Sequence, residues 1–319
     1  MSQLLITGGA GFIGSNFAKT SINRGWKVRI LDNLSTGLQS IADELELNGA
    51  EIIIGDIRDE LLLDEAMNGC DAVVHLAAQV SVPLSVSNPE ETMSINVDGT
   101  SKVIAACLKH GVKRLVIASS AAVYGETESL PLKEEDAGHI LSPYAESKWE
   151  NETQIIDARK KGLQATALRF FNVYGDGQRP DGPYAAVIPK FADMMAQGIM
   201  PQINGDGLQT RDFVHVHDVC EAIYSLIEGD WKAEPFHIYN VAAQSKITLL
   251  ELVEAINTSL SSFLPDYIHI SPAHGPERVG DIRHSMASIE RIQSTLDWRP
   301  KVGFEEGIKG LVQERLSLK

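Results

Sequence analysis

The sequence predicts an α/β fold built on a doubly wound parallel sheet, with a smaller C-terminal α/β lobe. Short runs rich in Val, Ile and Leu alternate with helical patterns up to about residue 171. This alternation is typical of parallel strands that are covered by helices on both faces. Beyond that point the pattern becomes irregular and rich in Gly and Pro. Right-handed crossovers between successive strands then give the doubly wound topology.

The expected elements follow in chain order. The first strand is expected at residues 4–7 and the helix after it at 11–24. Further strands are expected at 27–31, 51–54, 71–76, 114–118 and 166–169, long helices at 89–110 and 144–161, and a late strand at 237–241. Residues 1–172, joined by roughly 212–244, would form the larger domain. Residues 173–319 would form the smaller lobe over the carboxyl ends of the strands, where ligands bind in such sheets.

Composition and charge narrow the class of protein. The net charge of −15 over 319 residues repels nucleic acid and anionic membranes, so neither is expected as a partner. No apolar run is long enough to span a bilayer, and the first residues lead into a strand without the features of a signal peptide. The three cysteines, Cys70, Cys107 and Cys220, are widely spaced, which suits a reducing cytoplasm better than disulfides or a metal site.

A glycine-rich turn follows the first strand and opens the first helix. Its spacing, Gly8-x-x-Gly11-x-x-Gly14, lets the backbone turn tightly and approach a pyrophosphate at the N-terminus of the helix. Phe12 and Ile13 belong to the same turn. The alternative is a turn that binds nothing, because glycine triplets also match by chance. The position between a strand and a helix favours a dinucleotide site of the Rossmann type.

A carboxylate at the end of the second strand indicates which dinucleotide is bound. Asp32 lies 18 residues after Gly14, where it would accept hydrogen bonds from the adenosine ribose hydroxyls and repel a 2′-phosphate. Asn33 follows, and no Arg occurs up to residue 37, so NAD is favoured over NADP. Asp56 and Ile57, after the third strand, would border the adenine. For Asp56 a turn or cap role is the alternative.

Three side chains form the expected chemical centre. Tyr144 and Lys148 are four residues apart and share one face of a helix, for which Ser142 and Pro143 are the N-cap and the first residue. A nearby ammonium favours a phenolate, so Lys148 is expected to lower the pKa of Tyr144 and make it a base. Ser120, at the end of the fifth strand, would hold the substrate hydroxyl. A Tyr–Lys pair alone is more often an ordinary surface pair, but the glycine turn and the serine favour a nicotinamide-dependent enzyme that acts on a carbinol.

These motifs together resemble the extended short-chain dehydrogenase/reductase superfamily. The segments that carry the resemblance are 7–14 (TGGAGFIG), 32–33 (DN), 75–79 (HLAAQ), 119–125 (SSAAVYG) and Tyr144-x-x-x-Lys148. Three further segments, 169–172 (RFFN), 205–213 (GDGLQTRDF) and 278–285 (RVGDIRHS), are similar to those of nucleotide-sugar 4-epimerases. The resemblance runs from residue 1 to about 310, so it is not a local match.

The resemblance implies a nucleotide-sugar substrate with UDP as the nucleotide. It implies that Asn172 and Arg211 contact the diphosphate and that Arg278 pairs with a phosphate. Asp281 would accept a hydrogen bond from the uridine ribose, and Val187 would line the uracil site. Local cations such as these arginines are what an acidic protein needs in order to bind an anionic ligand.

Departures from related enzymes narrow the reaction. Similar 4,6-dehydratases carry Asp-Glu just after the catalytic hydroxyl residue to eliminate water, whereas this chain has Ala121 and Ala122. Similar UDP-glucuronate decarboxylases carry a Glu in this region, which is also missing. UDP-glucuronate epimerases tend to place an Arg in the loop after the Ala-Gln motif, whereas residues 80–84 (VSVPL) hold no cation. A 4-epimerase of a neutral UDP-hexose, acting through a transient 4-keto sugar, is therefore expected.

Ser285 bears on the choice of sugar. In the similar epimerases, the position four residues after the ribose-binding Asp borders the C2 substituent, where a Tyr blocks an N-acetyl group and a small residue admits it. Ser285 holds that position. It favours UDP-N-acetylglucosamine and UDP-N-acetylgalactosamine, with UDP-glucose and UDP-galactose as additional candidates. The alternative is that Ser285 only packs, because pockets reject oversize groups better than undersize ones.

Other functions stay open at this point. A reductase or dehydrogenase with net NADH turnover is the alternative within the same class. A non-catalytic NAD-sensing module is the alternative outside it, although the intact Ser120, Tyr144 and Lys148 argue against such a module. The family also implies a homodimer through the helices expected at 89–110 and 144–161, which nothing in the composition tests.

Two histidine features are interpreted as structural. His215 and His217 have a spacing that could ligate a metal. A helix at 219–227 with Asp218 as its N-cap explains this segment better, so no metal is expected. His75 is interpreted as a packing residue at the end of a strand.

Overall fold

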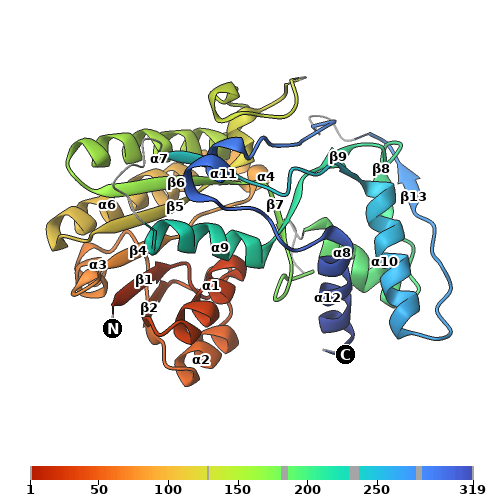
Figure 1. The fold of residues 1–319 in the computed structure, drawn as a ribbon, viewed down its shortest axis with the longest axis horizontal. Coiled ribbons are helices and arrows are strands. Elements are labelled where there is room, and N and C mark those ends of the chain that lie inside the picture. The colour runs from red at the N-terminus through yellow and green to blue at the C-terminus, as the bar shows by residue number, and fades with distance from the viewer. Residues whose placement is uncertain (1, 128, 181–185, 230–236, 278–281, 318–319) are drawn as a thin grey trace.

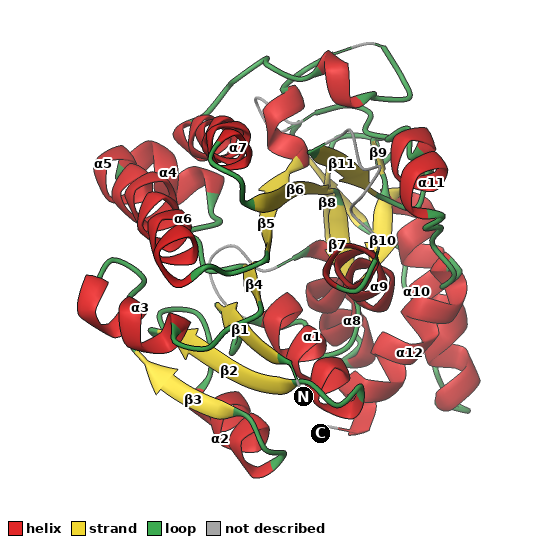
Figure 2. Cartoon of the chain, turned by 60° about the vertical axis from the view of Figure 1, so that its left-hand side comes forward, coloured by secondary structure: helices red, strands yellow, loops and turns green. Residues whose placement is uncertain are grey.

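The computed structural model describes residues 2–127, 129–180, 186–229, 237–277 and 282–317. Within them, seven parallel strands form the central sheet in the order β11-β6-β5-β4-β1-β2-β3 (Figure 2). The strands are β1 Gln3–Thr7, β2 Lys27–Asp32, β3 Glu51–Ile54, β4 Ala72–His75, β5 Arg114–Ser120, β6 Gln164–Phe170 and β11 Ile238–Val241. The chain runs outward from β1 to β3 and then crosses back to β4, so the strand order reverses beside β1. The predicted doubly wound α/β fold is confirmed.

Helices cover both faces of the sheet, because each strand presents apolar residues alternately to the two sides. The helices are α1 Phe12–Asn23, α2 Gln39–Leu47 and α9 Val216–Ile227 on one face, and α3 Glu60–Met67, α6 Gly99–His110 and α7 Pro143–Lys160 on the other (Figure 2). In β1, the buried Leu4 and Ile6 join the core under α1 and α9, whereas Leu5 joins the core under α3 and α6. No helix in the described part of the chain is long and apolar enough to cross a membrane.

The long helix predicted at 89–110 contains a π-helical turn. After α4 Val82–Ser87, the chain forms α5 Pro89–Met93, the π turn Ser94–Asp98 and then α6. In the turn, the carbonyls of Asn96 and Val97 accept hydrogen bonds from the side chains of Asn151 and Gln154 on α7, at 2.8 and 3.0 Å. Helix α7 therefore satisfies acceptors that the π turn leaves outside the α-helical ladder.

The smaller lobe has its own apolar core. This core lies between α8 Val187–Ala196, α10 Leu249–Phe263 and α12 Phe304–Ser317 (Figure 1). Its side chains include Phe191, Leu252 and Ile308, all of them buried. Three short strand pairs accompany it: β7 Asn172–Tyr174 with β10 Phe213–His215, β9 Thr210–Arg211 with β12 Ile247–Thr248, and β8 Gln202–Asn204 with β13 Ala273–Gly275.

The chain after β11 does not stay in the smaller lobe. Helix α11 Glu290–Leu296 packs against β11, and Ala287, Ile292 and Trp298 join the core under α1 and α9. The sequence predicts this segment in the smaller lobe, whereas these three side chains pack in the core of the larger domain. The domain boundary at residue 172 remains a prediction. Two short 3₁₀ helices, Ala121–Tyr124 and Glu134–Asp136, lie between β5 and α7.

Helix α9 begins three residues before its predicted start. Its N-cap is His215, whose side chain accepts a hydrogen bond from the His217 N–H. The assignment of Asp218 as N-cap is therefore wrong. Asp218 is buried, and its carboxylate accepts hydrogen bonds from the N–H groups of Lys301 and Val302 at 2.8 and 3.1 Å. It ties α9 to the segment that leads into α12.

Candidate active site

The carboxyl ends of β1 and β4 meet at the glycine-rich turn between β1 and α1. Gly8 has a φ of +73°, and a Cβ there would lie 2.6 Å from the backbone nitrogen of Ala77, just after β4. A Cβ on Gly14 would collide with the carbonyl oxygen of Gly8. Both positions therefore require glycine. The close turn leaves the N-terminus of α1 accessible to a ligand.

The N-terminus of α1 has no side-chain cap of its own. Gly11 is the N-cap and cannot accept a hydrogen bond through a side chain, and the first turn holds no acidic residue. Phe12 and Ile13, both half-buried, begin the helix. Because the first N–H groups of a helix carry the positive end of its dipole, this terminus fits a pyrophosphate.

Asp32 ends β2 with its carboxylate beside the glycine-rich turn. Its Oδ2 accepts a hydrogen bond from the Ala10 N–H at 2.9 Å, and its Oδ1 accepts one from the Leu34 N–H at 2.8 Å. These two donors orient the carboxylate and leave further lone pairs for ribose hydroxyls. The neighbouring Asn33 is exposed, and its Nδ2 donates to Asp56 at 3.3 Å.

Asp56 and Ile57 follow β3. The Arg58 guanidinium donates to Asp56 at 2.8 Å and holds the pKa of that carboxyl below its usual value. Ile57 is buried against Gly99, where α6 begins. The Arg58 N–H also donates to the Asp56 carboxylate at 2.9 Å, which supports the turn role that the sequence left open for Asp56. The contact with adenine stays a prediction.

Tyr144, Lys148 and Ser120 lie together at the carboxyl end of β5. Ser142 caps α7 with its hydroxyl, as the sequence predicts. The Tyr144 phenol lies close enough to the Ser120 hydroxyl for Ser120 to favour a lower pKa of the phenol. Lys148 Nζ lies 6.0 Å from the centroid of the Tyr144 ring and donates to the carbonyl of Ala118 at 2.9 Å. The helix and the strand end thus bring a phenol, an ammonium and a hydroxyl into one group.

The electrostatics of this group differ from the expectation. Burial raises the pKa of Tyr144, and the Ser120 hydroxyl opposes that rise. Burial lowers the pKa of Lys148 to about 8, against the attraction of the Glu152 carboxylate. The Lys148 ammonium donates to the Ala118 carbonyl, and burial is the largest influence on the pKa of Tyr144. Desolvation outweighs the charge effect that the spacing suggested.

A buried ion pair lies behind these three residues, and the sequence analysis did not single it out. Glu152 on α7 and Arg169 in β6 are each 2% exposed. Arg169 binds both carboxylate oxygens of Glu152, at 2.8 and 2.7 Å, and the Ser119 hydroxyl donates to the same carboxylate at 2.5 Å. The network fixes α7 to the ends of β5 and β6. The spacing of Tyr144, Lys148 and Glu152, each four residues after the last, is the signal that could have indicated it.

A second buried network supports α7 from the π turn. Asn96 accepts a hydrogen bond from the Gln79 N–H at 2.8 Å and donates to the Gln79 carbonyl at 2.9 Å. It also donates to the Ser147 hydroxyl at 2.9 Å, which in turn donates to the carbonyl of Tyr144 at 2.8 Å. The loop after β4 is thereby tied to the turn of α7 that carries Tyr144. No spacing in the sequence indicates this contact, because a single π turn has no repeat of its own.

Three residues that the resemblance assigns to the substrate lie on neighbouring strands. Asn172 begins β7, and Arg211 lies in β9, just before the β10 strand that pairs with β7. The N–H of Ser285 donates to the carbonyl of Thr210 at 3.2 Å, which ties Ser285 to the same strands. Ser285 is itself 9% exposed. The strand pairing therefore gathers these three predicted substrate residues in one region.

The other predicted substrate residues lie elsewhere in the chain. Val187 begins α8 and packs against the core of the smaller lobe. Arg278 and Asp281 fall outside the described residues. Their roles stay as the resemblance implies them.

The histidines named from the sequence are part of the packing. His215 lies edge-on to Tyr174 and to His217, and burial lowers the pKa of His215 to about 4. His75 is buried between two threonine hydroxyls, as its strand-end position suggested. Among the described residues, no three His, Cys, Asp or Glu side chains are grouped so that they could hold a metal ion.

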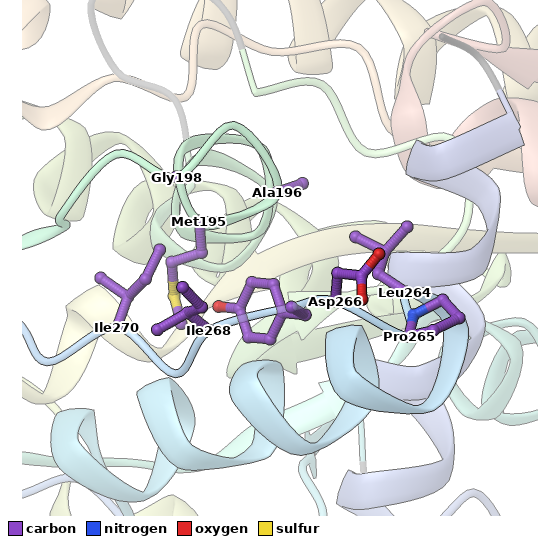
Figure 3. Close-up of a pocket in the computed structure, with 9 residues that line it drawn as sticks. Met195, Ala196, Gly198, Leu264, Pro265, Asp266, Ile268 and Ile270 are labelled. Atoms are coloured by element: carbon purple, nitrogen blue, oxygen red, sulfur yellow. The ribbon is translucent and has the colours of Figure 1, made fainter.

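A cavity of about 630 Å³ lies on the smaller lobe, apart from these residues (Figure 3). Met195, Ala196 and Gly198, around the end of α8, form one wall, and the segment between Leu264 and Ile270 forms the other (Figure 3). Its lining includes none of the residues predicted to bind the cofactor or the substrate.

The fold places a glycine-rich turn at the start of α1 and a group of Ser, Tyr and Lys at a neighbouring strand end, an arrangement typical of enzymes that use a dinucleotide. Residues 4–242 match the model of the NAD dependent epimerase/dehydratase family. The chain belongs to this NAD-dependent family, which confirms the resemblance and the choice of cofactor. The residues fit NAD, because the N-terminus of α1 has no side-chain cap of its own and the Asp32 carboxylate lies beside the glycine-rich turn, where an adenosine ribose would bind.

Relatives within the family cover the whole chain. The putative UDP-glucose 4-epimerase of Methanocaldococcus jannaschii is 39% identical over 314 residues, which is 97% of each chain. The UDP-N-acetyl-alpha-D-glucosaminuronate decarboxylase of Bacillus cytotoxicus is 33% identical and covers 98% of this chain and 97% of its own. The solved structure of the UDP-N-acetylglucosamine 4-epimerase from Methanobrevibacter ruminantium M1, in complex with UDP-N-acetylmuramic acid, superposes with a TM-score of 0.92 at 36% identity and covers 100% of this chain and 99% of that one. Relatives of this chain thus carry out more than one reaction.

Proposed function

We propose that the protein is an NAD-dependent 4-epimerase of a UDP-hexose. The preferred substrates are UDP-N-acetylglucosamine and UDP-N-acetylgalactosamine, with UDP-glucose and UDP-galactose as additional ones. One observation carries the proposal. Three side chains are grouped at the end of β5, those of Ser120, Tyr144 and Lys148. The two residues directly after Ser120 are alanines, Ala121 and Ala122, whose side chains can act neither as an acid nor as a base. Such a site can move one proton to and from a hydroxyl but has no second acid–base pair for eliminating water.

The chain's own residues handle the proton and hold the sugar. Tyr144 removes the proton of the sugar 4-hydroxyl while Ser120 holds that oxygen by a hydrogen bond. The Lys148 ammonium favours the phenolate form of Tyr144 that accepts this proton, and Tyr144 becomes a neutral phenol once it has done so. Bound NAD supplies the redox chemistry, as the acceptor and donor of a hydride. Tyr144 returns the proton after the 4-keto sugar has turned its opposite face, so C4 is inverted.

Inversion requires a fixed nucleotide and a sugar that can turn. Arg211 and Asn172 hold the diphosphate, and Arg278 pairs with a phosphate, as the resemblance implies. The grip on UDP keeps C4 near Tyr144 in both orientations, so the second half of the reaction remains intramolecular.

The functional test is an assay of the protein as purified, with each of the four UDP-sugars and no added NAD. Conversion to the 4-epimer without net NADH supports the epimerase, whereas net NADH formation identifies a dehydrogenase. NAD binding without turnover of any sugar identifies a sensing module. UDP-N-acetylglucosaminuronate serves as a further substrate, and carbon dioxide release from it would identify a decarboxylase. Tyr144→Phe, which keeps the ring but removes the proton acceptor, should nearly abolish turnover and leave NAD binding intact.

Sugar selectivity is tested at Ser285. A tyrosyl ring there would fill the space that an N-acetyl group needs, so Ser285→Tyr should lose turnover of the N-acetyl pair selectively. Ser285→Ala is the matched control, because it removes the hydroxyl without adding bulk and should keep both activities. Equal loss on both substrate pairs, or no loss, would show that Ser285 does not set the C2 preference.

We also propose, from the family resemblance, that two copies associate through α5, α6 and α7. Light scattering that gives the mass of one chain would refute this. The buried, unpaired thiols of Cys70, Cys107 and Cys220 suit the reducing cytoplasm that we propose as the location.

A further inference from the structure

We propose that Asp212 is the positioning residue of the nucleotide-sugar site. Its carboxylate and carbonyl tie together the chain segments that carry Asn172, Arg211 and Ser285. The inference rests on the proposed function, in which those three residues bind or border the substrate. Asp212 is 0% exposed, so it acts through its neighbours and does not touch a ligand.

The backbone of Asp212 holds the first segment. Asp212 lies between β9 and β10, directly after Arg211. Its carbonyl accepts a hydrogen bond from the Asn172 N–H at 3.0 Å, and β10 then continues the parallel pairing with β7. The positions of Asn172 and Arg211 relative to each other are therefore set at residue 212.

One carboxylate oxygen of Asp212 holds the loop after β11. Oδ1 accepts a hydrogen bond from the Ala243 N–H at 2.9 Å, and the N–H groups of Gln244 and Ser245 lie near enough to favour the charged form of the carboxylate. Gln244 has a φ of +57°, a left-handed conformation that lets successive N–H groups converge on one anion. The loop therefore forms a nest for the Asp212 carboxylate, and β11 connects this nest to the central sheet.

The other carboxylate oxygen holds the segment that carries Ser285. Oδ2 accepts a hydrogen bond from the Ala287 N–H at 3.0 Å. Two residues earlier, the Ser285 N–H donates to Thr210 in β9. The segment is thus fixed at two points. One contact is with Asp212 itself, and the other is with Thr210, two residues before it.

The bonding pattern explains why this residue is an aspartate. A carboxylate has only acceptors, and every contact it makes here is with an N–H donor. Burial raises the pKa of Asp212 to about 6, and the backbone donors oppose that rise. The group is therefore charged at neutral pH. An asparagine would turn an NH₂ group towards at least one N–H donor, which leaves buried groups without partners.

The test compares Asp212→Asn with a matched control, Asp218→Asn. Asp218 is also buried (2% exposed), and its carboxylate also accepts two backbone N–H groups, but it holds the segment before α12 and none of the predicted ligand residues. Titration calorimetry measures the affinity of each NAD-loaded protein for UDP, and thermal unfolding measures its stability. Both variants should lose stability. Asp212→Asn should weaken UDP binding by about 10-fold or more while NAD affinity stays unchanged, and Asp218→Asn should leave UDP affinity within about 2-fold.

Equal UDP affinity in Asp212→Asn and the wild type would overturn the inference, as would equal losses in the two variants. A wild-type protein that binds no UDP would instead refute the proposed function, so the two failures are distinguishable. Should Asp212→Asn not fold, hydrogen–deuterium exchange of the wild type replaces it. Residues 243–245 carry none of the predicted ligand residues, yet UDP binding should protect them together with residues 209–213. Protection of 209–213 alone would overturn the inference.

Discussion

His75 should make the protein progressively less stable in acid. Its Nδ1 lies 2.6 Å from the Thr7 hydroxyl, next to the glycine-rich turn, and its Nε2 lies 2.8 Å from the Thr100 hydroxyl on α6. The side chain is 4% exposed, and burial lowers its pKa to about 3, with Lys148 adding to the effect. The folded protein therefore keeps this imidazole neutral over a range in which the unfolded chain protonates it.

The direction and size of the effect follow from the two pKa values of His75. Its folded pKa lies below the unfolded value of about 6.5, so its contribution to stability is complete above about pH 6.5 and is lost as the pH falls. The loss is about 1.4 kcal/mol per pH unit until the folded pKa near 3 is reached. Between about pH 6 and pH 4, His75 alone should lower the free energy of unfolding by about 2.5 kcal/mol.

The assay is urea unfolding of the wild type and His75→Gln at several pH values. The variant carries a neutral amide throughout, so it loses a hydrogen-bonded imidazole at neutral pH but escapes the acid penalty. The stability gap between the two proteins should therefore shrink by about 2.5 kcal/mol from pH 6 to pH 4. His139→Gln is the control for the loss of an imidazole at an exposed position. A gap for His75→Gln that is constant or grows over this range would refute the reasoning.

Four further predictions concern the cofactor site, the chemical centre and the loop after β11. Asp32→Ala should weaken NAD binding about 10-fold and ease NADP entry, measured by fluorescence titration, and an unchanged preference would remove Asp32 from the ribose site. Because burial lowers the pKa of Lys148 to about 8, turnover should fall through the loss of one proton above about pH 8, and a flat pH–rate profile there would contradict the role of the ammonium. Glu152→Gln leaves the Arg169 guanidinium buried beside a neutral amide and should cost about 3–5 kcal/mol in urea unfolding; a loss under about 1 kcal/mol would count against the buried pair. Gln244→Gly places glycine at a left-handed backbone position and keeps the N–H groups of the nest, so it should raise the free energy of unfolding by about 0.5–1 kcal/mol and leave UDP affinity unchanged. A lower melting temperature of the variant would contradict this.

The features that were predictable from the sequence are local ones. The strands were visible because buried parallel strands are continuous apolar runs, and right-handed crossovers between them predict the doubly wound topology. The turn with Gly8 and Gly14 was visible because its glycine spacing is a pattern within seven residues of chain. Ser142 as the cap of α7 was predictable for the same reason. Each of these leaves a pattern among residues that are near in sequence.

The features that the sequence did not reveal depend on contacts between distant residues. Asp218 is of a residue type that often caps helices, but His215 caps α9. Asp218 instead accepts hydrogen bonds from two N–H groups that lie 83 and 84 residues further along the chain. The spacing of Tyr144 and Lys148 indicates a shared helix face. It does not reveal that the ammonium turns to Ala118 or that burial dominates the pKa of the phenol. Likewise, residues 287–298 return to the core under α1 and α9, and this depends on which apolar faces remain uncovered once the sheet has formed.

Two polar networks, the Glu152–Arg169 ion pair and the contacts of Asp212, meet at one short segment of chain. Arg169, at the end of β6, anchors the helix that carries Tyr144, and Asn172, three residues later, is anchored to Asp212. In extended chain, three residues span roughly 10 Å, so the backbone itself sets the separation between the chemical centre and the proposed diphosphate anchor. The proposed epimerase needs this separation to stay fixed while the sugar turns, because Tyr144 would serve both faces of C4. The arrangement therefore places rigidity in the backbone between the two anchors and leaves the freedom to rotate to the substrate.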